Sequence, residues 1–128
     1  MKRTWPIIGV NSVDASNRWY RGLFGQPQTP PAHADFTQLS DDDGTILLCL
    51  HEWAGHGAGP PLDSPNDGTP GTGLLLVFRV DDFDACLERA RSLTSVFEAE
   101  PDIGEGTNTM AFTLRDPDGY YVQVNSIS

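Results

Sequence analysis

The chain repeats one pattern, and this internal duplication limits the folds open to it more than any other feature. An apolar run ending at Val10 leads into a helix start, and the same arrangement returns 70 residues later at Val80. The acidic turn that ends at Gly44 returns 75 residues later at Gly119. Duplication of one βαβββ unit accounts for both offsets, with about five extra residues between helix and turn in the second copy.

The first copy is predicted to begin with a strand and a helix. Asp14 is a good N-cap, and Gly25 can supply the left-handed residue that ends the helix. Prolines after residue 26 prevent further helix, and they leave open whether an edge strand lies between residues 28 and 34. The predicted elements are a strand at 7–10, a helix at 15–23, and strands at 35–40 and 45–53, the last two joined by the turn Asp41-Asp42-Asp43-Gly44.

The second copy follows a stretch rich in glycine and proline at 54–73, which we interpret as a linker. Its helix is indicated by apolar residues at i, i+3, i+4 and i+7, namely Phe83, Cys86, Leu87 and Ala90. The other predicted elements are strands at 74–80, 95–99, 109–115 and 120–125. We therefore expect a single domain over 1–128, with modules at 1–53 and 74–128.

Charge and apolar content narrow the classes of partner. Eight Lys and Arg against eighteen Asp and Glu give a formal charge of −10, which repels phosphate backbones and anionic lipids. We expect neither nucleic acid nor a membrane as a partner.

The first residues hold only a short apolar run, no stretch has the length of a membrane span, and Cys49 and Cys86 lie in apolar segments. These features predict a cytoplasmic protein whose cysteines pack in the core, with a redox or ligand role as the alternative.

Two segments resemble the vicinal oxygen chelate superfamily, which includes glyoxalase I, extradiol dioxygenases, fosfomycin-resistance enzymes and bleomycin-resistance proteins. They read DASNRWYRGLFG at 14–25 and FTLRDPDGYYVQV at 112–124. The resemblance implies an α+β fold of two βαβββ modules, the glyoxalase/bleomycin-resistance/dioxygenase fold. In that fold a cupped mixed sheet carries the helices on its convex face and the functional site in its trough.

The resemblance also implies four positions where metal-dependent members place histidine or glutamate. Carried over to this chain, they are Trp5, Leu48, Leu75 and Gln123. None of these is a convincing ligand for a divalent ion, and a slip of one residue restores no imidazole or carboxylate. The sequence is therefore most similar to the non-metal, bleomycin-resistance-like branch. We expect a homodimer without a cofactor that sequesters a small organic ligand in the trough.

Strand alternation assigns side chains to the trough. The family register turns Leu48, Leu50 and Glu52 inward, and it does the same for Tyr121, Gln123 and Asn125. Arg79, a charge within an apolar strand, needs a partner such as Glu52 or an acidic ligand. Packing remains the alternative role for Trp5, Trp53 and Tyr121. The predicted ligand-binding residues are Trp5, Ile7, Leu48, Leu50, Glu52, Trp53, Leu75, Arg79, Tyr121 and Gln123.

An enzyme is the second hypothesis. His51, Glu52 and His56 stand close together, although the histidines are five residues apart and the glycine at 55 disfavours the helix of a metalloprotease site. These three residues form an alternative, offset metal site. Glu52 is otherwise a candidate general base among apolar neighbours, in a lyase, isomerase or dioxygenase.

Overall fold

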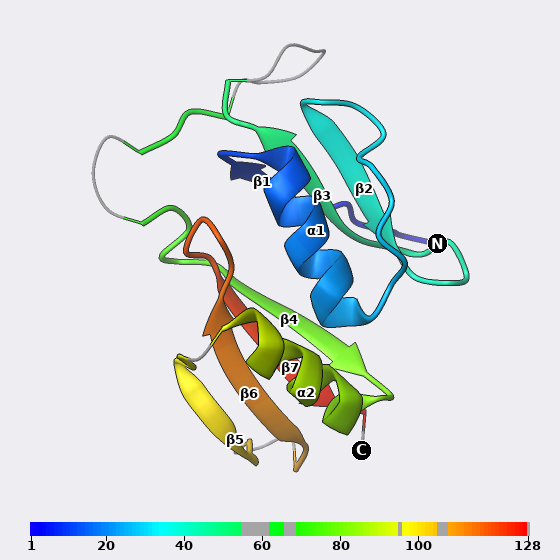
Figure 1. Cartoon of the computed structure of the whole chain (residues 1–128), viewed down its shortest axis with the longest axis vertical. Coiled ribbons are helices and arrows are strands. Elements are labelled where there is room, and N and C mark those ends of the chain that lie inside the picture. The colour runs from blue at the N-terminus through cyan, green and yellow to red at the C-terminus, as the bar shows by residue number, and fades with distance from the viewer. Residues whose placement is uncertain (55–61, 66–68, 95, 105–107, 128) are drawn as a thin grey trace.

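The computed structural model describes residues 1–54, 62–65, 69–94, 96–104 and 108–127, and it contains two helices and two mixed sheets within them (Figure 1). The elements in chain order are β1 (Ile7–Val10), α1 (Val13–Phe24), β2 (Phe36–Ser40), β3 (Ile46–Glu52), β4 (Leu75–Val80), α2 (Phe83–Leu93), β5 (Ala99–Ile103), β6 (Met110–Arg115) and β7 (Tyr121–Ser126).

Each module forms its own sheet. The first has the strand order β1-β3-β2 and the second β4-β7-β6-β5, and in both the first strand runs parallel to the last. The predicted α+β class and the modular layout are thus confirmed. The first module contains three strands and not four, since residues 26–34 hold no strand and carry the three prolines that cannot donate to a sheet ladder. The described residues of the predicted linker, 54, 62–65 and 69–73, contain neither helix nor strand.

Helix α1 begins two residues earlier than predicted, at Val13 and not at residue 15. The Ser12 Oγ accepts a hydrogen bond from the Ala15 backbone N–H at 3.1 Å, so Ser12 and not Asp14 is the N-cap. Asp14 instead lies in the first turn, where its negative charge interacts favourably with the positive end of the helix dipole. Gly25 ends the helix as predicted, with a left-handed φ of 71°.

The edge strand β5 is displaced from the predicted range of 95–99: residues 96–98 are not in a strand, and β5 begins at residue 99. It runs from Ala99 to Ile103, and all but one of its residues are exposed. Because neither face is buried, the strand has no alternating pattern for sequence reasoning to detect. Pro101 fits there, since an edge strand leaves one row of N–H groups unpaired.

Both helices cover the same side of the two sheets (Figure 1). Tyr20 and Phe24 of α1 contact Phe78 of β4 through their rings, with centroids 6.2 and 4.9 Å apart, so the first helix packs on the second module as well as on its own. α1 and α2 also pack against each other. The buried core therefore lies between helices and sheets and is shared by both modules.

The hairpins of the two modules share a turn and differ by a bulge. Gly44 and Gly119 each have positive φ and donate to the carbonyl of the aspartate three residues before, both at 2.9 Å. In the first module Leu39 pairs with Leu48 but Ser40 pairs with Ile46, which leaves Leu47 as an extra residue. This β-bulge shifts the register of the rest of β3 by one residue relative to β7.

No helix in the described part of the chain is both long and apolar enough to cross a membrane.

Candidate functional site

The site lies on the sheet faces turned away from the helices, which we call the open faces. On β4, Leu75, Val77 and Arg79 alternate with the buried Leu76 and Phe78. The pairings Leu75–Tyr121, Val77–Gln123 and Arg79–Asn125 place the β7 residues on the same open face. The face assignment predicted for the second module is therefore confirmed.

The prediction for β3 is wrong by one residue. Leu48 and Leu50 are fully buried in the core shared with α1, and they pair with Leu39 and Ile8, which also belong to that core. Cys49 takes the place that the sequence offset gave to Leu48, since it pairs with Ile7 on the open side. The bulge at Leu47 is the cause, because a shift of one residue turns every later side chain to the other face.

Apolar side chains dominate the first strands of the two open faces, and they are unusually exposed. Trp5 is 60% exposed, Ile7 45%, Leu75 50% and Val77 47%. Ile7 lies on β1, and Leu75 and Val77 lie on β4, each the edge strand of its sheet, whereas Trp5 precedes β1 by two residues. Large apolar side chains gathered on the exposed face of an edge strand are candidates for ligand or protein binding.

Polar groups on the last strand are held by neighbouring side chains. The Gln123 Nε2 donates to Asn125 Oδ1 at 2.7 Å. Arg115 lies over the Tyr121 ring, 4.1 Å from its centroid, and also donates to the Tyr121 hydroxyl at 2.6 Å. Glu98 accepts a further hydrogen bond from Arg115 at 2.6 Å. These amide and phenol groups are therefore fixed in place and able to orient a ligand.

Arg79 does not pair with Glu52. Its guanidinium donates to the Ile127 carbonyl at 2.9 Å, and no salt bridge joins it to a carboxylate among the described residues. The Arg79 side chain is exposed, so it does not require the partner charge that was predicted from the sequence.

The residues of the alternative metal site do not converge. His51 and Glu52 are consecutive on β3 and project to opposite faces, and the His51 Nδ1 lies 2.7 Å from the Glu52 backbone carbonyl. Glu52 is exposed, so it lacks the apolar surroundings proposed for a general base. Trp53 covers Gly9, where an added Cβ would lie 2.1 Å from its ring. His56 lies outside the described residues.

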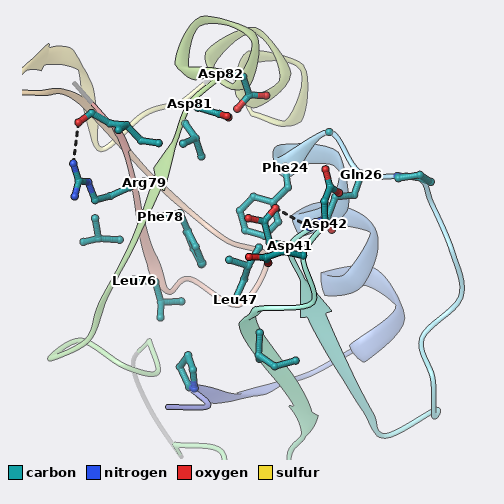
Figure 2. Close-up of a pocket in the computed structure, with 18 of the residues that line it drawn as sticks. Phe24, Gln26, Asp41, Asp42, Leu47, Leu76, Phe78, Arg79, Asp81 and Asp82 are labelled. Atoms are coloured by element: carbon teal, nitrogen blue, oxygen red, sulfur yellow. Dashed lines mark hydrogen bonds between the residues drawn. The ribbon is translucent and has the colours of Figure 1, made fainter. Parts of the chain in front are cut away.

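A groove of about 840 Å³ runs between the two modules, and we call it the intermodule groove. The first module contributes the C-terminal end of α1, Leu47 and the turn at 41–43, and the second contributes β4 and the residues that follow it. Figure 2 shows Asp41 and Asp42 on one side and Asp81 and Asp82 on the other, with Arg79 extending away toward the C-terminal segment. Open-face residues of β4 thus line one wall of an acidic groove.

The two cysteines are buried thiols. Burial raises the pKa of Cys49, although a hydrogen bond with Gln38 acts in the opposite direction. Burial also raises the pKa of Cys86 to about 11, and its Sγ donates to the Leu23 carbonyl at 3.3 Å. Both thiols therefore stay protonated at neutral pH, which fits core packing better than a reactive role.

A linkage between the modules was not foreseen from the sequence. The turn at 116–119 accepts hydrogen bonds from the first module: Asp116 from the Tyr20 hydroxyl at 2.7 Å, and Asp118 from the Asn11 N–H at 2.8 Å. Tyr120 donates in return to the Gly9 carbonyl at 2.8 Å. The acidic turn is a turn signal in the sequence, but nothing there indicates that it contacts α1 and β1.

Comparison with known proteins identifies the family. The profile of the Glyoxalase/Bleomycin resistance protein/Dioxygenase superfamily matches residues 4–124, and the chain belongs to this superfamily. No curated protein matches the chain.

Solved structures agree on the fold. A protein from the mobile metagenome of V. pseudocholerae is 21% identical with a TM-score of 0.68, covering 100% of this chain and 98% of that one. Lactoylglutathione lyase from Agrobacterium tumefaciens is 18% identical with a TM-score of 0.67, covering 98% and 93%. A glyoxalase/dioxygenase from Nostoc punctiforme is 21% identical with a TM-score of 0.70, covering 98% and 90%. At these identities the likeness shows the fold alone.

The residues at the four family metal positions do not fit a divalent ion. With the register corrected, these positions hold Trp5, Cys49, Leu75 and Gln123: an indole, a thiol, an alkyl group and an amide. A thiol whose pKa is raised by burial is a poor ligand, because metals bind the thiolate. In the described part of the chain, no group of three or more histidines, cysteines or carboxylates is arranged to hold a metal ion.

Proposed function

We propose that this protein binds a small organic molecule without a metal ion and sequesters it against the open faces, in the manner of bleomycin-resistance proteins. One observation carries the proposal: the four positions that would surround a metal hold Trp5, Cys49, Leu75 and Gln123. An ion there would lose its hydration without gaining anionic ligands, at a high cost in free energy. Apolar side chains with a few fixed polar groups are instead typical of a pocket for an organic ligand.

The ligand-binding residues in this proposal are a revised form of those predicted from sequence. Leu48 and Leu50 are left out, because both side chains face the helices and are fully buried in the shared core. Cys49 takes their place in the register, but its side chain is also fully buried, so it is left out as well. Glu52 is left out because it lies on the same face of β3 as the helix-facing Leu48 and Leu50, and Val77 is added because it is exposed on the open face of β4. The proposed set is Trp5, Ile7, Trp53, Leu75, Val77, Arg79, Tyr121 and Gln123.

A homodimer is part of the proposal. β1 and β4 each pair on one side only, and their open-face side chains Ile7 and Val77 are nearly half exposed. A second copy would cover this apolar surface and extend the sheets. Light scattering coupled to gel filtration should give twice the chain mass, and the double variant Ile7→Glu with Val77→Glu should give the mass of one chain. A wild-type protein that stays monomeric at high concentration would contradict this part.

The proposed partners include neither nucleic acid nor membranes, and the proposed location is the cytoplasm. The formal charge of −10 supports both exclusions through repulsion of phosphate groups. The enzyme hypothesis receives no support from the geometry, because His51 and Glu52 diverge and Glu52 is exposed.

A ligand screen in the presence of a chelator tests the proposal. Aromatic metabolites and antibiotics are added to protein in EDTA, and a true ligand raises the melting temperature. Leu75→Ala should reduce that shift, whereas the matched control Ile103→Ala, an exposed aliphatic residue on β5, should leave it unchanged. A shift that EDTA abolishes and a divalent ion restores would show that binding depends on metal and would overturn the proposal.

A further inference from the structure

The polar part of the second open face is built around Arg115 on β6. Arg115 pairs with Tyr121, and Tyr121 pairs with Leu75 on β4, so the three side chains form one row across the open face. Each guanidinium nitrogen donates one hydrogen bond: Nε to Glu98 at 2.6 Å, Nη1 to the Gly119 carbonyl at 3.0 Å and Nη2 to the Tyr121 hydroxyl at 2.6 Å. Acceptors from three segments therefore hold the guanidinium in one orientation.

The direction of the hydrogen bond between Arg115 and Tyr121 follows from their chemistry. A guanidinium can only donate, so the Tyr121 oxygen is the acceptor and its own hydrogen remains available. Within the described ranges, no hydrogen bond uses this hydrogen. The guanidinium also lies over the Tyr121 ring, 4.1 Å from the centroid, and the ring side chain is half-buried. Tyr121 is therefore a fixed hydrogen-bond donor on the open face.

The next polar side chain on β7 selects less sharply. Gln123 lies two residues further along the same face, and its Nε2 donates to Asn125 Oδ1 at 2.7 Å. The Gln123 amide keeps an acceptor oxygen and a second N–H hydrogen, so it can pair with either kind of ligand group. The acceptor side of the Tyr121 hydroxyl is occupied by Arg115, so this hydroxyl chiefly offers a ligand its hydrogen.

Apolar surface lies directly beside this donor. Leu75, the β4 neighbour of Tyr121, is 50% exposed, and Val77 is 47% exposed on the same face. Covering such side chains with a ligand removes apolar surface from water. A ligand that covers them and reaches the Tyr121 hydroxyl needs an apolar body with a hydrogen-bond acceptor at one edge.

The charge around Arg115 decides between a neutral and an anionic acceptor. Glu98 already forms a salt bridge with Arg115 at 2.6 Å, and both side chains are partly withdrawn from water. A ligand carboxylate would stand beside Glu98 without a cation of its own, and the formal charge of −10 adds to the repulsion. A neutral carbonyl oxygen accepts the Tyr121 hydrogen without this cost.

We infer that Arg115 is the positioning residue of the ligand site and that the ligand is a neutral molecule with a carbonyl oxygen beside an apolar body. Arg115 holds Tyr121 so that its hydroxyl donates to that oxygen, while Leu75 and Val77 contact the apolar body. This inference rests on the proposed function and adds the feature by which the site selects its ligand.

Two probes of one shape isolate the carbonyl oxygen. Fluorenone and fluorene are both planar and neutral, and a carbonyl group in the first replaces a methylene group in the second. Equilibrium dialysis with the wild-type protein should give a Kd for fluorenone about two- to tenfold lower than the Kd for fluorene. Infrared spectra of bound, isotope-labelled fluorenone should show the carbonyl stretching band at lower frequency than in cyclohexane, because a hydrogen bond weakens the C=O bond.

Two variants separate positioning from direct contact. Tyr121→Phe removes the donor and keeps the ring, so the preference for fluorenone over fluorene should disappear and the carbonyl band should move to higher frequency. Arg115→Met should reduce the preference in the wild-type protein but should not reduce it further in the Tyr121→Phe background. An equal further reduction there would show that Arg115 acts on the ligand directly and would overturn the positioning role.

Arg91 on α2 provides a matched control. It makes the same kinds of contact as Arg115, a salt bridge with Glu100 at 3.0 Å and a ring contact with Phe97 at 4.8 Å from the centroid. Arg91→Met therefore removes the same charge and similar contacts outside the site, and it should leave the preference unchanged. A reduction equal to that of Arg115→Met would reduce the effect to charge or stability and overturn the inference. Tyr121→Phe loses a single oxygen atom, and a preference that survives in this variant overturns the inference even if Arg115→Met fails to fold.

The outcomes also separate the inference from the proposed function. Equal affinity of the wild-type protein for fluorenone and fluorene would overturn the inference while the binding function stands. Tighter binding of fluorene-9-carboxylate than of fluorenone would show that Arg115 pairs with an anion, which also overturns it. Failure of both neutral probes to bind would overturn the inference as well, whereas the EDTA screen tests the function without any assumption about the acceptor.

Discussion

The two faces of a single strand show how this chain divides its apolar residues between folding and function. On β4, the helix-facing Leu76 and Phe78 are 8% and 9% exposed, whereas Leu75 and Val77 on the open face are 50% and 47% exposed. The four side chains are similar in polarity, so polarity does not decide their burial. The helices cover one face and leave the other available.

The difference assigns separate roles to the two faces. Burial of the helix-facing side chains removes apolar surface from water and stabilises the fold. The open-face side chains contribute little to folding while they remain exposed, so their apolar character needs another reason. We attribute it to a ligand and to a second copy of the chain.

The largest difference between the faces is expected in stability. Leu50→Ala removes a fully buried side chain and should lower the free energy of unfolding by about 2–5 kcal/mol. Val77→Ala on the open face should lower it by less than about 1 kcal/mol. Urea unfolding monitored by circular dichroism measures both. Equal losses would mean that the open face is part of the core and would remove the contrast.

Alkaline pH should weaken the helix-facing core through Cys86. Its folded pKa of about 11 lies above the ordinary value of 9.0, so its contribution to stability is complete below pH 9 and is lost as the pH rises through 11. The loss is about 2–3 kcal/mol at most. Cys86→Ala should flatten this part of the pH profile, whereas an unchanged profile in the variant would show that the thiol is not responsible. Tyr120, with a pKa raised by burial to about 12, should act in the same direction at higher pH.

A smaller effect is expected at the link between the modules. Tyr20→Phe removes the donor to Asp116 and leaves a buried carboxylate with fewer hydrogen bonds, which should cost about 1–3 kcal/mol. Burial already raises the pKa of Asp116, and loss of the Tyr20 hydrogen bond should raise it further. Stability of the variant should then recover as the pH falls through this raised pKa, because protonation removes the buried charge. A variant whose stability shows no such recovery would contradict this role for Tyr20.

Most of the fold could be predicted from sequence because local patterns specify it. The stop at Gly25 requires a left-handed residue, and the turns before Gly44 and Gly119 have the composition that such turns need. The edge strand β5 was misplaced because its exposed residues carry no apolar period. Ser12 was missed as the N-cap because Asp14, two residues later, suits that role equally well by composition.

The site was harder to predict because it depends on register and on contacts between modules. The bulge at Leu47 exchanged Leu48 for Cys49 on the open side, and nothing in that apolar run distinguishes the two registers. The aspartates at 41–43 and at 81–82 were interpreted as a turn and a helix cap. Only the packing of α1 on β4 brings them to the same groove.

Metal titration of the untagged, chelator-treated protein tests the central claim most directly. Calorimetry with zinc, nickel, manganese and ferrous ions should detect no stoichiometric binding to the wild type. The variant that combines Trp5→His, Leu75→His and Gln123→Glu should gain a site, because it restores imidazole and carboxylate donors at the family positions. Stoichiometric binding of any of these ions by the wild-type protein would contradict the account.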